Sequence, residues 1–150
     1  MKHLTTPQPA LCPCGGALPG QRSNAHAPLF AQCCGRFLEG GEAATNALEL
    51  MRSRYSAYVL GNTAYLRTSW AEQTCPATLE TDASLTAPDA PRWLGLQINR
   101  FIERDAQHAE VEFVARYKVQ GRAHRLQELS RFVRGEDGHW RYLDGDVQET

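Results

Sequence analysis

Residues 93–144 constrain the fold more than any other part of this chain. Apolar and polar side chains alternate there, and short polar turn signals break the alternation at residues 105–107, 120–122 and 136–138. The pattern predicts strands at residues 93–104, 109–119, 124–134 and 139–144. The sequence therefore predicts a curved antiparallel four-stranded sheet.

The turn at residues 137–138 is Asp-Gly, which tolerates positive φ at both central positions and predicts a two-residue hairpin. Pairing across that turn places Arg131 opposite Asp144 and Val133 opposite Tyr142. We therefore expect Arg131 and Asp144 to form a cross-strand ion pair, which contributes little to stability when it is exposed.

A second two-residue turn, at residues 121–122, would align Phe113 with Ser130 and Ala115 with Glu128. One face of the sheet is then apolar apart from Glu128 and Ser130, and its apolar members are Val111, Phe113, Ala115, Tyr117, Leu126, Phe132 and Leu143. The other face mixes charged and apolar side chains, as a partly wet surface does. We expect a helix to cover the first face.

Residues 48–60 supply that helix. Apolar and aromatic side chains recur there at spacings of three and four residues, as an α-helix requires: Leu48, Met51, Tyr55, Tyr58 and Val59. Arg54 is expected on the opposite side. Thr45 or Asn46 is expected to cap the helix, and Gly61 is expected to end it.

Two shorter helices are expected at residues 63–69 and 77–83, before a proline-containing segment at residues 87–91 stops helical propagation. The predicted architecture is an α+β fold. Its helices close over the curved sheet to form a cone.

The composition is that of an ordinary globular domain. Of the 150 residues, 42% are hydrophobic and 22% are charged, and the formal net charge is -1. The chain as a whole is therefore not drawn toward nucleic acid or an anionic membrane. No apolar run could span a bilayer, and the first residues lack the apolar centre of a secretory signal, so we expect a cytoplasmic protein.

Four of the five cysteines crowd into residues 12–34, as Cys12 and Cys14 beside two glycines and as the adjacent pair Cys33 and Cys34. In a reducing compartment such a set is typical of metal ligands rather than of disulfides. Four thiolates complete a tetrahedral structural zinc site with no open position. A metal-free cluster of small buried side chains is the alternative.

A zinc ion is favoured because a segment of about 35 residues, rich in Pro, Gly and polar side chains, cannot order itself by burial alone. His26 lies between the cysteine pairs and could replace one of them, although four thiols suffice. Cys75 stands alone with no histidine beside it in the sequence, so we expect a small packing residue rather than a nucleophile.

Glu128 is a polar side chain on an otherwise apolar face, where Arg52, Tyr55 and Tyr58 of the covering helix would lie near it. A general base tuned by burial and a guanidinium is one interpretation, and a structural ion pair between Glu128 and Arg52 is the commoner one. Aromatic side chains at element ends more often seal a core than bind a ligand. The remaining pocket candidates are Trp70, Trp93 and Ser130.

The segment at residues 116–134 is locally basic, and a basic ribbon can follow phosphates. Its cationic side chains alternate between two faces, however, and no array of exposed stacking aromatic residues accompanies them. Nucleic-acid binding is therefore not expected.

Six segments spread over nearly the whole chain match a known pattern. They are Cys-Pro-Cys-Gly at 12–15, Met-Arg-Ser-Arg-Tyr-Ser-Ala-Tyr at 51–58, Arg-Trp-Leu-Gly-Leu at 92–96, Phe-Val-Ala-Arg-Tyr at 113–117, Glu-Leu-Ser-Arg-Phe at 128–132 and Trp-Arg-Tyr-Leu-Asp-Gly at 140–145. Together they resemble the YchJ family of uncharacterised bacterial proteins. The resemblance implies a cone similar to the nuclear transport factor two (cystatin-like) fold, which ketosteroid isomerase and scytalone dehydratase also use.

The N-terminal cysteines resemble a SEC-C motif, the zinc-binding element that serves protein contacts at the tail of the preprotein translocase motor ATPase. That resemblance implies Cys12, Cys14, Cys33 and Cys34 as the ligands of a structural zinc ion. Residues 15–32 form a longer loop than the motif usually has. No second motif precedes Thr150, so bivalent docking is not expected.

We expect a flexible tail at residues 1–11, a zinc knuckle at 12–36 and the cone at 44–146. Two functions stay open. In the first, the knuckle docks on a protein partner while the cone supplies bulk or forms a homodimer. In the second, the cone binds a small molecule or acts as an isomerase-like or dehydratase-like enzyme. The first is slightly favoured because a shared fold does not imply shared chemistry, and an open cavity would favour the second.

Overall fold

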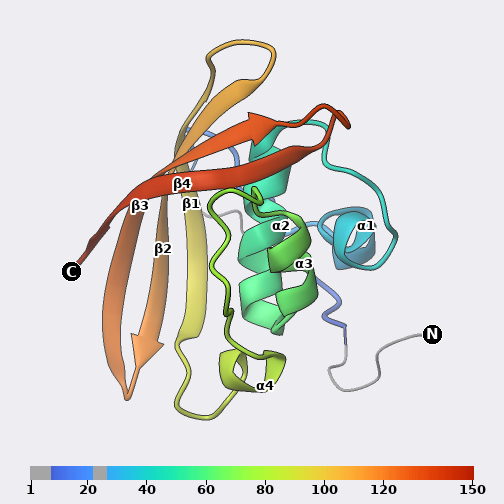
Figure 1. The fold of residues 1–150 in the computed structure, drawn as a ribbon. Helices are drawn as coiled ribbons and strands as arrows, with labels where there is room; N and C mark the ends of the chain where they lie inside the picture. Colours follow the sequence, from blue (N-terminus) through green and yellow to red (C-terminus); the bar gives the residue numbers. More distant parts are fainter. Residues whose placement is uncertain (1–7, 22–26) are drawn as a thin grey trace.

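The computed structural model describes residues 8–21 and 27–150 of the chain. Its elements are η1 (Phe30–Gln32), α1 (Gly35–Leu38), α2 (Ala47–Leu60), α3 (Thr63–Thr68), α4 (Asp82–Leu85), β1 (Arg92–Glu103), β2 (His108–Val119), β3 (Arg122–Arg134) and β4 (Trp140–Glu149). Figure 1 shows α2 packed against the inner face of the curved sheet, with α3 beside α2 and α1 beyond it. The predicted α+β architecture is confirmed. Among the described residues, no helix combines the length and the apolar character that crossing a bilayer requires.

The sheet has four antiparallel strands in the order β1-β2-β3-β4, as the turn signals predicted. Register shifts in β1 lie between Trp93 and Gly95 and between Ile98 and Arg100. Such bulges bend a strand and increase its twist, which helps the sheet to curve around α2. The inner face of β2 and β3 carries the predicted side chains: Val111, Phe113, Ala115, Tyr117, Leu126, Glu128, Ser130 and Phe132.

The predicted register between β2 and β3 is wrong by two residues. Val119 pairs with Arg122, so the turn is Gln120-Gly121, and Phe113 lies opposite Glu128 rather than Ser130. Gln120 has φ 51° and Gly121 has φ 79°, which is the positive-φ pair that a tight hairpin turn demands. A shift of two residues preserves the facing of every side chain, so the prediction of the inner face survives.

The pairing between β3 and β4 is confirmed at Arg131 and Asp144 but wrong beyond it, because Phe132 rather than Val133 lies opposite Tyr142. A bulge after Arg131 takes up one extra residue of β4, Leu143. Tyr142 therefore takes the place on the inner face that the sequence had suggested for Leu143. β4 also runs to Glu149, beyond the predicted end at residue 144.

The turn before β4 differs from the two-residue hairpin predicted at residues 137–138. Gly138 N donates to Gly135 O (2.9 Å), so Glu136 and Asp137 are the central residues of the turn. Gly138 follows in the left-handed region with φ 81°. A turn of this kind followed by a left-handed residue is a common longer hairpin connection.

Helix α2 begins at Asn46, whose side chain accepts from Glu49 N (2.8 Å), so Asn46 rather than Thr45 is the cap. The Glu49 carboxylate accepts from the Thr45 backbone N–H (2.9 Å), which completes a reciprocal capping arrangement. Gly61 ends the helix with φ 76°, as predicted.

The prediction that Arg54 lies on the outer side of this helix is wrong, because only 6% of its surface is exposed. α2 contacts the sheet, α3 and α1, so it is covered on more than one side. Its buried residues are Ala47, Leu48, Leu50, Met51, Ser53, Arg54, Tyr55, Ser56 and Ala57. A helix surrounded in this way does not show a single apolar stripe.

Helix α3 agrees with the prediction at residues 63–69, whereas the helix predicted at residues 77–83 is mostly absent and α4 begins at Asp82. Thr81 caps α4 by accepting from Ser84 N (3.1 Å), which fixes the start of the helix late in that segment. Ala71, in the loop after α3, donates its backbone N–H to Tyr142 O (2.7 Å) and ties this side of the helical layer to β4.

The segment before α2 contains η1 and α1, which the sequence did not predict. This segment packs against β1 and α2. Gly20 N donates to Ile98 O (3.0 Å) in β1, and Arg52 Nη1 of α2 donates to Ala17 O (3.2 Å). Its cysteines belong to the same buried cluster as the core residues of α2 and the sheet.

Candidate functional site

The four N-terminal cysteines converge on one point. Their sulfur atoms all lie within 4.8 Å of one another, and Cys14 Sγ is 3.6 Å from Cys33 Sγ. A tetrahedral ion with metal–sulfur distances of about 2.3 Å holds its sulfurs about 3.8 Å apart, so the spacing fits a four-thiolate site. It is far too long for a disulfide, which needs about 2.05 Å. The described cysteines are all free, and the predicted cluster could hold a metal ion.

Two glycine-containing turns hold these thiols in place. Gly16 donates its backbone N–H to Cys14 Sγ (3.3 Å), and a Cβ at Gly16 would lie 2.8 Å from Pro28 Cδ. Gly35 follows the second cysteine pair, and a Cβ there would lie 2.6 Å from Phe30 O. Both positions therefore need the small residue, and the turn delivers a backbone donor to sulfur.

The electrostatics of the four cysteines favour a cation among them. Hydrogen bonds with Cys14, Cys33 and Cys34 lower the pKa of Cys12. In contrast, hydrogen bonds with Cys12, Cys14 and Cys33, together with burial, raise the pKa of Cys34. Neighbouring thiolates repel one another, so they can all ionise only around a positive charge. His26, the alternative ligand, lies outside the described residues. Cys75 is not part of the cluster.

A cavity of about 260 Å³ lies between α2, Trp70 in the segment after α3, and the inner face of the sheet. Aromatic and apolar side chains form most of its wall, and a few polar groups point into it. Its lining residues are Met51, Arg54, Tyr55, Tyr58, Trp70, Trp93, Phe113, Ala115, Leu126, Glu128, Ser130, Phe132 and Tyr142. A mostly apolar concavity with few convergent polar groups is the usual form of a ligand site.

Arg54 is the cation of this cavity. Its guanidinium lies between two rings, with Cζ 4.8 Å from the centroid of Trp70 and 4.8 Å from that of Tyr142. Nη1 donates to Leu66 O (2.9 Å) and to Ser69 Oγ (2.7 Å). Burial raises the pKa of Tyr58, and the neighbouring Arg54 opposes that rise. Burial lowers the pKa of Arg54 itself, and the neighbouring tyrosines and Glu128 oppose that fall. The protein fixes the guanidinium, which keeps its charge at neutral pH because an arginine starts from so high a pKa.

Glu128 is the anion of the cavity. Its Oε2 accepts from Ser130 Oγ (2.7 Å) and from Tyr142 Oη (2.9 Å). Burial raises the pKa of Tyr142, and Glu128 adds to that rise, so the phenol stays protonated and donates. Gly145 gives the carboxylate room, because a Cβ there would lie 2.2 Å from Glu128 Oε2.

Six of the seven predicted pocket residues line the cavity, and the seventh, Arg52, does not. The predicted ion pair between Arg52 and Glu128 is wrong, since Arg52 donates to Ala17 O in the cysteine segment. Sequence reasoning missed Arg54 and Tyr142. Arg54 follows Met51 by three residues and precedes Tyr58 by four, which is the helical spacing that could have indicated it.

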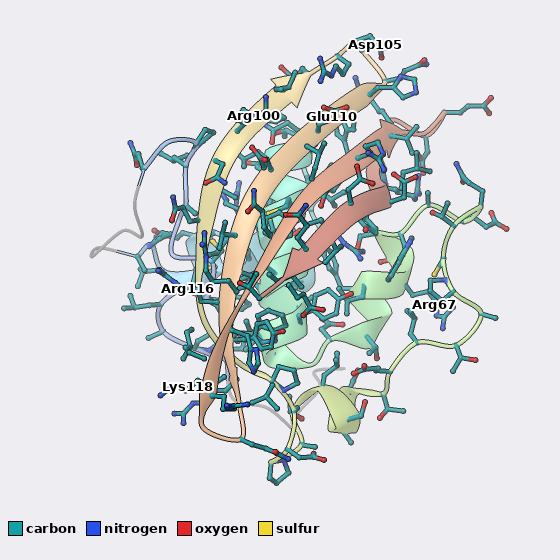
Figure 2. The ribbon with its side chains drawn as sticks, turned by 90° about the vertical axis from the view of Figure 1, so that its left-hand side faces the viewer. Arg67, Arg100, Asp105, Glu110, Arg116 and Lys118 are labelled. Atoms are coloured by element: carbon teal, nitrogen blue, oxygen red, sulfur yellow. The ribbon has the colours of Figure 1, made fainter. Side chains whose placement is uncertain are left out.

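The outer face of the sheet is a separate, charged surface. Figure 2 faces it, and Arg116 and Lys118 lie toward the β2–β3 turn while Arg100 and Glu110 lie toward the opposite end. Arg100 pairs with Glu112 (3.0 Å), and the predicted cross-strand pair of Arg131 with Asp144 is confirmed at 2.6 Å. The charges at that end are therefore largely matched.

Comparison with known proteins extends the match beyond the fold. Residues 46–145 match the description of the YchJ middle NTF2-like domain. The UPF0225 protein RSc0270 of Ralstonia nicotianae is 49% identical over 156 residues, covering 97% of this chain and 98% of that protein. A UPF0225 protein of Bordetella bronchiseptica is 44% identical over 149 residues, covering 98% of each chain.

Two solved structures share the architecture. The solution structure of RPA3114, a SEC-C motif containing protein from Rhodopseudomonas palustris, has a TM-score of 0.70 and 25% identity, covering 81% of this chain and 94% of that one. The crystal structure of a SEC-C motif containing protein from Psychrobacter arcticus has a TM-score of 0.70 and 30% identity, covering 92% and 82%. With these matches the predicted resemblance is confirmed, and the chain belongs to the YchJ family, whose relatives carry the name UPF0225.

Proposed function

We propose that this protein binds a small organic molecule in the cavity of its cone, while a structural zinc ion on the four cysteines orders the segment that packs against α2. The observation that carries the proposal is the cavity itself. About 260 Å³ remains between the helices and the sheet, walled by aromatic rings, with Arg54 and Glu128 at its surface. A cone with no binding role could have filled that space with larger side chains, as protein interiors usually do.

Zinc is the metal that the donor set favours. Four thiolates in a closed tetrahedron are typical of structural zinc, because they leave no position for water or substrate. The cysteines are nearly inaccessible, with 1–5% of their surface exposed. The same proposal places the protein in the reducing cytoplasm, where the thiols stay available to a metal.

The cavity reverses the order of the two hypotheses raised by the sequence. A filled cone would have left the interaction module as the better explanation, whereas an open one is what a small-molecule site requires. Likeness of fold to isomerases and dehydratases does not by itself supply a reaction, so the proposal is limited to binding.

A matched pair of variants on β3 tests the proposal. Leu126 lines the cavity, and Leu129 lies on the outer face of the same strand. Leu126→Trp should fill the cavity and Leu129→Trp should leave it open. We expect single-ring aromatic compounds to bind the wild type and Leu129→Trp in ligand-observed NMR, and binding to Leu126→Trp to fall at least tenfold. If none of the single-ring aromatic compounds tested, whatever their charge, binds the wild type, the proposal is wrong.

A second function, docking of the cysteine segment on a protein partner, is supported by a specific observation. Three of the five large hydrophobic side chains that are strongly exposed in the described residues flank the cysteines: Leu11 (55%), Leu18 (43%) and Leu29 (50%). Leu11 and Leu29 lie side by side on an isolated bridge. Exposed apolar side chains on a rigid support are typical of contact surfaces.

The double variant Leu11→Ser and Leu29→Ser tests the docking function, since neither residue is a metal ligand. A partner captured and cross-linked at this surface by the wild type should be lost by the double variant while the metal content stays the same. Retention of that partner by the double variant, or by a Cys33→Ser variant whose segment has lost its order, would count against docking.

A further inference from the structure

The cavity contains a cation that makes no direct ion pair with any described residue, although Glu128 lies near enough to act on it electrostatically. Arg54 is 6% exposed, yet none of the salt bridges found in residues 8–21 and 27–150 includes it. Two oxygen acceptors, two ring faces and the neighbouring Tyr58 side chain surround the guanidinium instead. Neutral acceptors and aromatic faces compensate a buried charge only in part, so a carboxylate brought by a ligand would find a strong partner here.

The guanidinium keeps donors for such a ligand. The hydrogen bonds that Arg54 donates to Leu66 and Ser69 both leave from Nη1. In the described part of the chain, the buried donors without a partner are Arg52 Nε and Trp70 Nε1, and no nitrogen of Arg54 is among them. Its Nε and Nη2 therefore retain accessible surface. A carboxylate can engage two guanidinium N–H groups at once, which gives direction as well as affinity.

The anion of the cavity lies away from this cation, and Tyr142 lies between them. Arg54 stacks over the Tyr142 ring, while the Tyr142 hydroxyl donates to Glu128 at 2.9 Å. No salt bridge joins Arg54 to Glu128 in the described part of the chain. A ligand that spans the cavity would therefore meet a cation at one point and an acceptor at another. The rings of Tyr55, Trp93 and Phe113 also line the cavity that such a ligand would occupy.

The size and wall of the cavity limit what can enter. Its volume of about 260 Å³ lies just below the usual range for drug-sized ligands, about 300–1,000 Å³, which suits a single ring with small substituents. An inorganic dianion would leave the aromatic wall unused, and Glu128 would repel it more strongly than a monocarboxylate whose single charge lies at Arg54. A flat ring would instead stack on the aromatic side chains, as aromatic pairs prefer.

We propose that the ligand is a small aromatic hydroxy acid, whose carboxylate pairs with Arg54 and whose hydroxyl group donates to Glu128. This assignment rests on the proposed function of the cavity and names the chemical class that it takes. It uses both charged groups of the cavity, which a neutral hydrocarbon or a simple carboxylate would not do.

Titration calorimetry with three probes of nearly one shape tests the assignment. The probes are 4-hydroxybenzoate, its neutral analogue 4-hydroxybenzamide, and benzoate, which lacks the hydroxyl. The wild type should bind 4-hydroxybenzoate at least tenfold more tightly than either other probe. Arg54→Met should abolish the preference for the carboxylate over the amide, and Arg54→Lys should retain part of it. Arg67→Met is the matched control, because Arg67 is exposed on α3 (Figure 2) and does not line the cavity.

Glu128→Gln tests the other end of the ligand. It should reduce the preference for 4-hydroxybenzoate over benzoate while the preference for carboxylate over amide stays. Urea unfolding of each variant verifies that it is folded. If Arg54→Met does not fold, Arg54→Lys replaces it in the test.

The outcomes separate this inference from the function on which it rests. If 4-hydroxybenzamide binds the wild type as tightly as 4-hydroxybenzoate, the cavity remains a small-molecule site and the assignment of a carboxylate ligand is overturned. A carboxylate preference that stays at its full wild-type size in folded Arg54→Met or in folded Arg54→Lys overturns it as well. Failure of every probe, charged or neutral, removes the proposed function together with the inference.

Discussion

The cone and the cysteine segment of this protein are ordered by different means. The cone contains a continuous ladder of four long strands and a helix buried on several sides. The cysteine segment has an isolated bridge, a three-residue 3-10 helix and a four-residue α-helix, none of which would be stable alone. Order is therefore distributed over many contacts in the cone, whereas in the segment it is concentrated in four thiols.

The two regions nevertheless meet in one core. Cys12 Sγ lies 3.6 Å from Ser56 Oγ of α2, and the cysteines form one buried cluster with Leu48, Met51 and Ile98. A segment with little regular structure of its own can therefore share its core with a body that has much, and the proposed metal would be needed by the segment alone. Three perturbations test how separable the two regions are.

Removal of one thiolate should have the largest effect. Structural zinc contributes an apparent binding free energy of about 10–16 kcal/mol in isolated finger peptides, and Cys33→Ser removes one of the four ligands. Residues 10–21 and 27–38 should then lose protection in hydrogen exchange, while β2 and β3 keep theirs. A chelator added to the wild type should give the same pattern. Cys75→Ser, outside the cluster, is the control. Unchanged protection of the segment would show that the segment needs no metal.

Truncation of the core of the cone should have a smaller but global effect. Ile98 is fully buried in β1, and replacing it with alanine should lower the free energy of unfolding by about 2–5 kcal/mol in urea. Metal content should stay at the wild-type level, because Ile98 is not a ligand. Leu94→Ala is the control in the same strand, where the side chain is 50% exposed and little should change. If Ile98→Ala loses metal as well as free energy of unfolding, the cone and the cysteine segment are not ordered independently.

Removal of an exposed ion pair should have the smallest effect on stability, and that effect should depend on pH. Arg141 binds Asp137 through two hydrogen bonds (2.6 and 3.1 Å) and holds the pKa of that carboxyl well below its usual 3.8. Because the folded pKa is the lower one, the pair stabilises the fold above about pH 4 and that stabilisation is lost as the pH falls further.

Asp137→Asn should therefore lower the urea midpoint slightly at pH 7 and less at pH 3. Glu136→Gln in the same turn is the matched control, since none of the salt bridges in the described residues includes Glu136. An equal deficit of Asp137→Asn at both pH values would assign the effect to the turn itself rather than to the charge.

Much of this structure could be predicted from local pattern. Strand alternation, turn residues and the thiol spacing act over a few positions, so the four strands and the cysteine cluster follow from the sequence. The inner face of the sheet survived a wrong register because the error was two residues, and side chains alternate with the same period. An error of one residue, as at Leu143, did change which side chain reached the cavity.

Helical spacing makes Arg54 a candidate for the cavity, but it does the same for Arg52, which lies four residues after Leu48 and three before Tyr55. With 3.6 residues per turn, the two arginines lie about 80° to either side of the apolar stripe of α2. Only the tertiary arrangement decides that one contacts the cysteine segment and the other enters the cavity. The helix predicted at residues 77–83 failed for a similar reason, since tertiary context overrides weak propensity in short segments.

Helix α2 separates the cysteine segment from the cavity. Its Arg52 donates a hydrogen bond to Ala17 O in the cysteine segment, and its Arg54 lines the cavity. A metal bound by the cysteines and a ligand bound in the cavity would each restrict the motion of this fourteen-residue helix. If the proposed metal and the proposed ligand each restrict α2, thermodynamic linkage requires that each change the affinity of the other by the same factor. Any dissociation constant for this protein acquires meaning only alongside the metal stoichiometry of the sample in which it was measured.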